Sequence, residues 1–215
     1  MLLTQCGDCN AQHFMNFIPK MVKIARKGLF ASLQNIIKEN TTMSDKTSEK
    51  AYELGFNYEK NYGGCAQCAI GALYEMFPGL KNEAVFKSAT GLGAGIGLTT
   101  SGNCGALAGT VMVLSQIYGR ELENIEDPER KRFVAYRLSE KLVNNFLDEY
   151  GSVTCSEIQK KLMGKSFYMY EEWEEFLEAG GHSTACTTVV GNATRWAANL
   201  IAELENKGVD KVVDT

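Results

Sequence analysis

Helical spacing of apolar residues is the feature that most constrains how this chain folds. Over residues 44–62, apolar side chains recur every three or four positions and fall on one face of a helix. That face would carry Ala51, Leu54, Tyr58 and Tyr62. Strand-like alternation is almost absent, and only three prolines interrupt the 215 residues. The sequence therefore predicts an all-α protein, a compact helical bundle.

Caps and breakers mark the expected helix ends. Asp127-Pro128 is a typical helix start, with Asp as N-cap and Pro at the first position, and Gly151 would end that helix. Ser183 or Thr184 would cap the last helix. The other expected helices cover residues 44–62, 65–77, 104–118, 155–163, 170–179 and 186–206.

Length and composition predict one main domain. Hydrophobic residues make up 45% of the chain, enough for a sizeable core. Residues 1–42 read as an N-terminal extension with a possible helix and a C-x-x-C at Cys6 and Cys9, and residues 43–215 as the helical domain. Met43 would itself serve as an ordinary protein start.

Charge and cysteine usage exclude several classes of protein. The net charge of −4 argues against a nucleic-acid partner bound through its phosphates. No run of about 20 apolar residues predicts a membrane span. Seven cysteines, an odd number, do not fit a disulfide scaffold, and no secretory signal is apparent. We therefore expect a cytoplasmic protein whose cysteines are thiols or ligands.

Four of these cysteines share one local setting, the start of a helix. Cys65 follows two glycines, Cys104 follows Asn103, and Cys186 falls in the first turn of the last helix. Cys155 lies in Thr154-Cys155-Ser156-Glu157, a capping box. A helix N-terminus favours a thiolate and can lower the pKa of a cysteine by about one unit or more. The alternative is that each is a small apolar core residue.

A glycine-rich segment leads into Cys104. Residues 90–104 read TGLGAGIGLTTSGNC, which has neither the dinucleotide-binding spacing nor a P-loop lysine. It would be a backbone-lined loop against a ligand or a loop for tight helix packing. The candidate contacts to a bound group are Gly93, Gly95, Gly97 and Gly105. Gly105 and Gly109 also form a small-residue face that admits a helix or a cofactor, and a small domain with such a face could form a homodimer.

The run Cys104-Gly105-Ala106-Leu107-Ala108-Gly109 carries a family resemblance. With Cys65 upstream and Cys155 and Cys186 downstream, it resembles the redox-active proteins catalogued by the pattern C…GCAxxG…C…C, over about residues 45–206. The resemblance implies an all-helical domain with a redox role. Similar domains occur beside covalent haem in split-Soret cytochromes. Covalent haem is not expected here, because Asn10 follows Cys9 and Ala69 follows Cys68 where a histidine is needed.

Three functions remain open from the sequence. In the first, the four cysteines converge within about 7 Å and bind an iron–sulfur cluster for electron transfer to a partner that the sequence does not identify. In the second, Cys65 and Cys68 form a catalytic dithiol for thiol–disulfide exchange. In the third, four cysteines, or three and His182, bind structural zinc. Whether the chain is an enzyme stays open.

Overall fold

The computed structural model describes residues 45–207. The predicted extension, residues 1–42, lies outside the described residues, and so do Cys6 and Cys9. The described part is helical and contains no strand, only an isolated bridge between Asn103 and Thr154. The expected all-α class is confirmed. Every helix within residues 45–207 is too short or too polar to cross a lipid bilayer.

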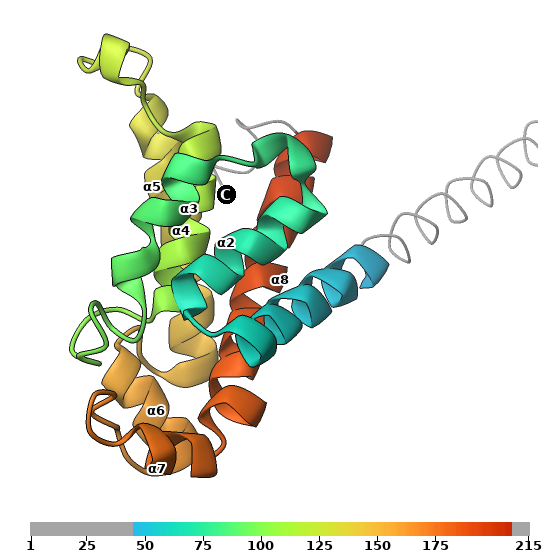
Figure 1. Ribbon diagram of the computed structural model, residues 1–215. Coiled ribbons are helices and arrows are strands. Elements are labelled where there is room, and N and C mark those ends of the chain that lie inside the picture. The colour runs from blue at the N-terminus through green and yellow to red at the C-terminus, as the bar shows by residue number, and fades with distance from the viewer. Residues whose placement is uncertain (1–44, 208–215) are drawn as a thin grey trace, which may run out of the picture. The chain divides into compact units, whose positions relative to one another are not determined.

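The helices follow one another through short connections (Figure 1). The longer ones are a helix over residues 45–62, α2 (Cys65–Met76), α4 (Gly105–Tyr118), α5 (Lys131–Tyr150), α6 (Cys155–Met163) and α8 (Cys186–Lys207). The shorter ones are η1 (Pro78–Leu80), α3 (Glu83–Ser88), η2 (Thr90–Leu92), η3 (Leu122–Asn124), α7 (Trp173–Glu178) and η4 (Gly181–Ala185), the last being a π-helical turn.

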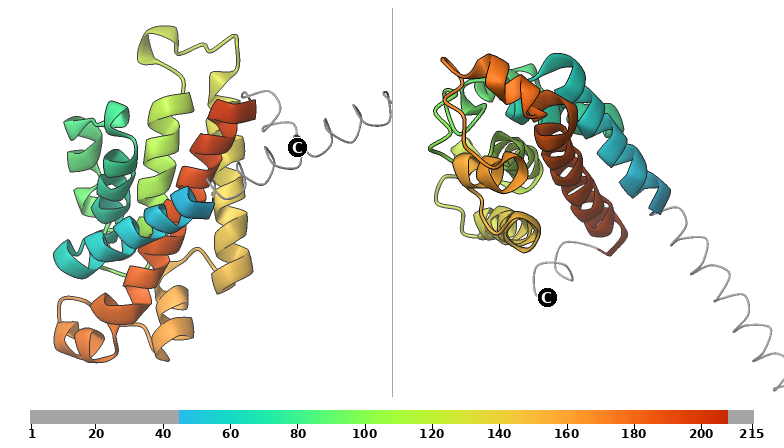
Figure 2. Two further views of the ribbon diagram at one scale, coloured as in Figure 1. Left: turned by 90° about the vertical axis from the view of Figure 1, so that its right-hand side faces the viewer. Right: turned by 90° about the horizontal axis from the view of Figure 1, so that it is seen from below.

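Four helices build the core: α4 contacts α2, α5 and α8, and α8 also contacts α2 and α5. Figures 1 and 2 show α6 and α7 together at one end of this bundle. Large side chains such as Leu114, Leu142 and Phe146 are fully buried between the helices. Each such side chain contributes about 1.5–3 kcal/mol relative to exposure. A second, smaller cluster of Phe167, Met169 and Phe176 lies at the α6–α7 end.

Small residues set how closely the helices approach. A Cβ added at Gly109 would collide with the backbone of Ala66, and one at Gly55 would lie 2.8 Å from the carbonyl oxygen of Val190. The predicted small-residue face of α4 therefore packs against α2 of the same chain. The homodimer that this face suggested stays a prediction.

Several helix starts differ from the expected ones. α5 begins at Lys131 rather than Pro128, because Asp127 adopts φ 53° in a turn and its carboxylate accepts hydrogen bonds from the Lys131 and Arg132 amides. α7 is shorter than the expected helix over residues 170–179. No serine or threonine cap precedes α8, since the η4 turn runs directly into it at Cys186.

Candidate functional site

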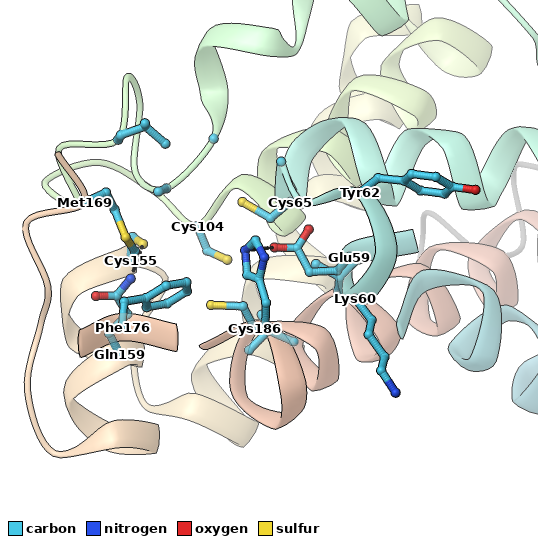
Figure 3. A pocket seen from close by; sticks show the side chains of 18 of the residues that line it. Glu59, Lys60, Tyr62, Cys65, Cys104, Cys155, Gln159, Met169, Phe176 and Cys186 are labelled. Carbon is cyan, nitrogen blue, oxygen red and sulfur yellow. Dashed lines mark hydrogen bonds and ion pairs between the residues drawn. The ribbon is translucent and has the colours of Figure 1, made fainter. Parts of the chain in front are cut away.

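A cavity of about 350 Å³ collects the predicted cysteines. Cys65, Cys104, Cys155 and Cys186 all line it, although they come from four different segments of the chain. In Figure 3 the sulfurs of Cys65, Cys104 and Cys186 point into the cavity, and Cys155 lies on the side of Met169 and Phe176. The described cysteines are all free thiols.

Backbone pairing holds two of these cysteines together. The amide of Cys104 donates to the Val153 carbonyl at 2.8 Å, and the amide of Cys155 donates to the Gly102 carbonyl at 3.0 Å. Asn103 and Thr154 form the isolated bridge between these two bonds. Because Asn103 takes part in this bridge, Cys104 is the N-cap of α4. The sequence had predicted Cys104 as the first residue of this helix.

The start of α6 follows the sequence in position but not in side-chain bonding. Thr154 is the N-cap and Cys155 is the first helical residue, as predicted. The capping box is not formed, because the Thr154 side chain makes no capping bond. Glu157 instead accepts a hydrogen bond from Lys160 at 2.8 Å.

The four predicted glycines have three kinds of surroundings: close to a cysteine, lining the cavity, or exposed. A Cβ added at Gly105 would collide with the Cys65 sulfur, and one at Gly95 would lie 2.9 Å from the Cys155 Cβ. These two glycines therefore make room for the cysteines. Gly93 lines the cavity. Gly97 is exposed, and an added Cβ would meet nothing within 4 Å.

The loop between η2 and α4 is unusually strained for non-glycine residues. Ala94, Ile96, Leu98 and Thr100 all have positive φ, between 41° and 69°. Such conformations are costly and cluster at functional sites. Ala94 and Leu98 line the cavity. The strain thus lies in the segment that forms one cavity wall.

Cys68 takes a different place from Cys65. Its thiol is buried and donates to the Gly63 carbonyl at 2.9 Å. Cys65 lines the cavity, whereas Cys68 is not among the cavity-lining residues of the described chain. The two members of this C-x-x-C therefore face different surroundings.

Burial is the largest influence on the pKa values of the four cavity thiols. Loss of solvation raises the pKa of Cys104 and of Cys155 to about 12, and it also raises the pKa values of Cys65 and Cys186. Amides at the start of α4 act in the opposite direction on Cys104, but more weakly. The expectation that helix starts would lower these pKa values is wrong, because desolvation exceeds the helix-terminal effect.

Glu59 is a cavity residue that the sequence did not reveal. It lies on the helix over residues 45–62 with only 2% of its surface exposed. Its Oε1 is 3.4 Å from Nε2 of His182, and its Oε2 has no hydrogen-bond partner. Burial raises the pKa of this carboxyl to about 7, while the Cys68 thiol lowers it by less. Its spacing of four from Gly55 and eight from Ala51 was the available signal.

His182, the predicted alternative zinc ligand, lines the same cavity from η4. Its ring packs edge-on against Trp173 and Phe176, with centroids 5.2 and 5.4 Å apart. Burial lowers the pKa of this imidazole. His182 is therefore neutral at neutral pH. Its imidazole contributes no positive charge to the cavity.

The side chains that line the cavity are of kinds that ligate metals. Thiols line it from several sides, and Glu59 adds a carboxylate oxygen without a partner. Among residues 45–207, however, no three His, Cys, Asp or Glu side chains are placed to hold one metal ion. A single zinc needs all sulfurs at about 2.3 Å from one point. An iron–sulfur cluster distributes its thiolate ligands over several irons.

Comparison with known proteins points to one family. A family whose description is "Putative redox-active protein (C_GCAxxG_C_C)" matches residues 63–200, more than half of the 215-residue chain. The match spans all four cavity cysteines. No curated protein and no solved structure shows a significant match.

Proposed function

The chain belongs to the C_GCAxxG_C_C family of redox-active proteins, and we propose that it transfers electrons through an iron–sulfur cluster held by Cys65, Cys104, Cys155 and Cys186. The observation that carries this proposal is that four cysteines from separate helix starts line one cavity. When bound, the cluster would supply one-electron transfer. Reduced surroundings and a protein partner follow from this role, and we propose the cytoplasm as the compartment.

The surroundings of the cysteines support cluster binding. Cys104 and Cys155 are buried and Cys65 and Cys186 are half-buried, and desolvation keeps all four as neutral thiols. Metal binding would replace their protons. The Ala106 and Leu107 amides favour the charged form of Cys104. Hydrogen bonds of this kind to a ligand sulfur help to set a cluster's reduction potential. The apolar side chains of the cavity would exclude water from the centre.

Two competing functions have weaker support. A zinc site would have to draw the four thiols toward one ion. Thiol–disulfide exchange would have to use Cys68, whose thiol is buried and bonded to the Gly63 carbonyl, and whose pKa is raised by burial. A raised thiol pKa reduces the thiolate that attacks a disulfide. The cluster therefore remains the function that the cavity supports best.

The test is isolation of the full chain without oxygen from iron-replete cells. We expect a brown protein with broad absorption near about 400 nm, with iron and sulfide in it. Cys65→Ser should remove the iron, and Cys68→Ser, the matched control three residues away, should only weaken its retention. A colourless, iron-free wild type would overturn the proposal. Bound zinc would favour the structural site, and a Cys65–Cys68 disulfide would favour thiol exchange.

A further inference from the structure

We propose that the cavity also binds a small organic cation, with a flat apolar body against Trp173 and an amidinium or ammonium group paired with Glu59. This goes beyond electron transfer, since it gives the site a small-molecule ligand. It rests on the proposed function in one respect: a cluster on the four cysteines would leave the ligand only the side of the cavity at Glu59, His182 and Trp173.

The size and lining of the cavity suit a small molecule. Its volume of about 350 Å³ lies within the roughly 300–1,000 Å³ that ligand pockets occupy. The apolar residues that line the cavity include Leu98, Ile158, Met169, Trp173 and Phe176. Pockets of this kind bind an apolar body and orient it through a few polar groups.

Glu59 supplies the polar group. A buried carboxylate oxygen without a donor is unfavourable unless something pairs with it. Oε2 of Glu59 has no hydrogen-bond partner, and Oε1 makes a long contact of 3.4 Å with His182. The Cys68 thiol also acts on this carboxyl and lowers its pKa, but by less than burial raises it. The ionised form of this carboxyl accepts hydrogen bonds and donates none, so the ligand group that stabilises the ionised form is a donor. An amidinium or ammonium group meets this need and brings the opposite charge.

The other charged and titratable groups of the cavity also favour a cation. The cysteines are neutral thiols or, with a cluster bound, anionic ligands. His182 is neutral at neutral pH. Lys60 lines the cavity, but Figure 3 shows its amine pointing away from the cysteines. No described cation thus competes for Glu59 within the cavity.

Exposed aromatic side chains give the ligand a way in. Trp173 is 39% exposed and Tyr62 is 76% exposed, and both line the cavity. Their partial exposure places them where the cavity meets solvent. The face of an indole ring also attracts cations. Trp173 therefore offers both an apolar surface and a favourable electrostatic contact for the proposed ligand.

Calorimetric titration of the full chain with benzamidine, a small aromatic amidinium, tests this inference. We expect saturable binding that Glu59→Gln weakens by about tenfold or more, because the charge-assisted pairing is lost. The matched control, Glu174→Gln, removes an equal charge from an exposed residue beside Trp173 and should leave the affinity within about twofold. Benzyl alcohol, which is uncharged, should bind wild type and Glu59→Gln equally.

Absence of saturable benzamidine binding would overturn the inference, as would equal affinity of wild type and Glu59→Gln. If Glu59→Gln does not fold, the benzamidine affinity of Trp173→Leu is measured instead. An affinity equal to that of wild type overturns the inference. Iron is measured on each sample. Iron without benzamidine binding leaves the cluster proposal standing alone. Glu59-dependent binding by a protein that never contains iron leaves the ligand site standing and rejects the cluster.

Discussion

Asp127 and Glu59 are both buried carboxylates, each 2% exposed, yet the protein treats them in opposite ways. Asp127 accepts hydrogen bonds from the Lys131 amide at 2.6 Å and from the amide and guanidinium of Arg132, each at 3.1 Å. These donors hold the pKa of Asp127 below its ordinary value. Glu59 has one long contact and one unpaired oxygen, and its pKa is raised.

The difference separates a fully paired acid from an incompletely paired one. The carboxylate of Asp127 accepts hydrogen bonds from the first amides of α5. Glu59 faces a cavity lined by thiols, and its Oε2 has no hydrogen-bond partner. Incompletely satisfied buried groups in native proteins call for an explanation such as catalysis or an absent ligand. Four predictions test this contrast between the pairing of Asp127 and that of Glu59.

The largest effect should come from the pH dependence of stability at Glu59. The pKa of this carboxyl is about 7 in the folded protein and 4.5 for an unperturbed glutamate. The folded state therefore binds the proton more tightly, and wild type should lose roughly 3 kcal/mol of unfolding free energy as the pH rises from about 4.5 through 7. Glu59→Gln should abolish this loss. Urea unfolding at pH 5 and pH 8, at equal metal content, measures it.

His182 contributes with the opposite sign in that experiment. Its pKa is lowered in the folded protein, so its contribution is present above about pH 6.5 and falls away as the pH decreases. The slope that remains in Glu59→Gln should therefore be the reverse of the wild-type slope. Glu174→Gln serves as the control and should follow wild type. Parallel curves for wild type and Glu59→Gln would show that Glu59 is not the unusual group described above.

The second effect is the loss of the Asp127 cap. Asp127→Asn should lower Tm by several degrees at pH 7, because the start of α5 loses its charged acceptor. A lowered carboxyl pKa gives stability that disappears as the pH falls through the folded value, which lies below 3.8. The variant and wild type should therefore converge at still lower pH. Asp148→Asn, an exposed site on α5, is the control for thermal unfolding by circular dichroism.

A smaller effect is expected from the partner of Asp127. Arg132→Gln removes the guanidinium but leaves both amide hydrogen bonds to the carboxylate. The fall in Tm should be clearly smaller than for Asp127→Asn. A double-mutant cycle measures the coupling between the two residues. Coupling as large as the whole Asp127 effect would mean that the ion pair, and not the helix cap, satisfies this acid.

The smallest effect should come from His182→Gln. The contact between Nε2 and Glu59 is long, at 3.4 Å, and the ring also packs on Trp173 and Phe176. Loss of one weak polar contact and one ring contact should change the unfolding free energy by about 1 kcal/mol. Urea unfolding at pH 7 measures it. A change in unfolding free energy several times larger would mean that His182 pairs strongly with Glu59. Glu59 would then be a well-paired acid, as Asp127 is.

Local signals predicted two of the four cysteine positions correctly, whereas Cys104 is the N-cap of α4 and no serine or threonine cap precedes Cys186. Glycines before Cys65 and the Thr154 cap before Cys155 set those helix starts, and both are confirmed. Gathering of the four thiols at one cavity followed from shared position and family pattern. Their acidity could not be predicted in the same way, because it depends on burial by side chains far apart in sequence.

Glu59 was missed for a related reason. The apolar pattern led to a predicted face through Tyr58 and Tyr62, and Tyr62 is 76% exposed. The buried row instead runs through Ala51, Gly55 and Glu59, where small residues give little apolar signal. Gly55 is needed because α8 approaches its backbone closely. Tertiary packing thus decided which side of this helix faces inward.

The bridge between Asn103 and Thr154 also fixes the spacing of two of the four cavity cysteines. Backbone hydrogen bonds fix Cys104 and Cys155 relative to each other, while Cys65 and Cys186 begin separate helices. A group that binds the four thiols would therefore meet one pair of cysteines whose backbone spacing is already set. Less conformational entropy is lost on binding when the contacting groups are preorganised in this way.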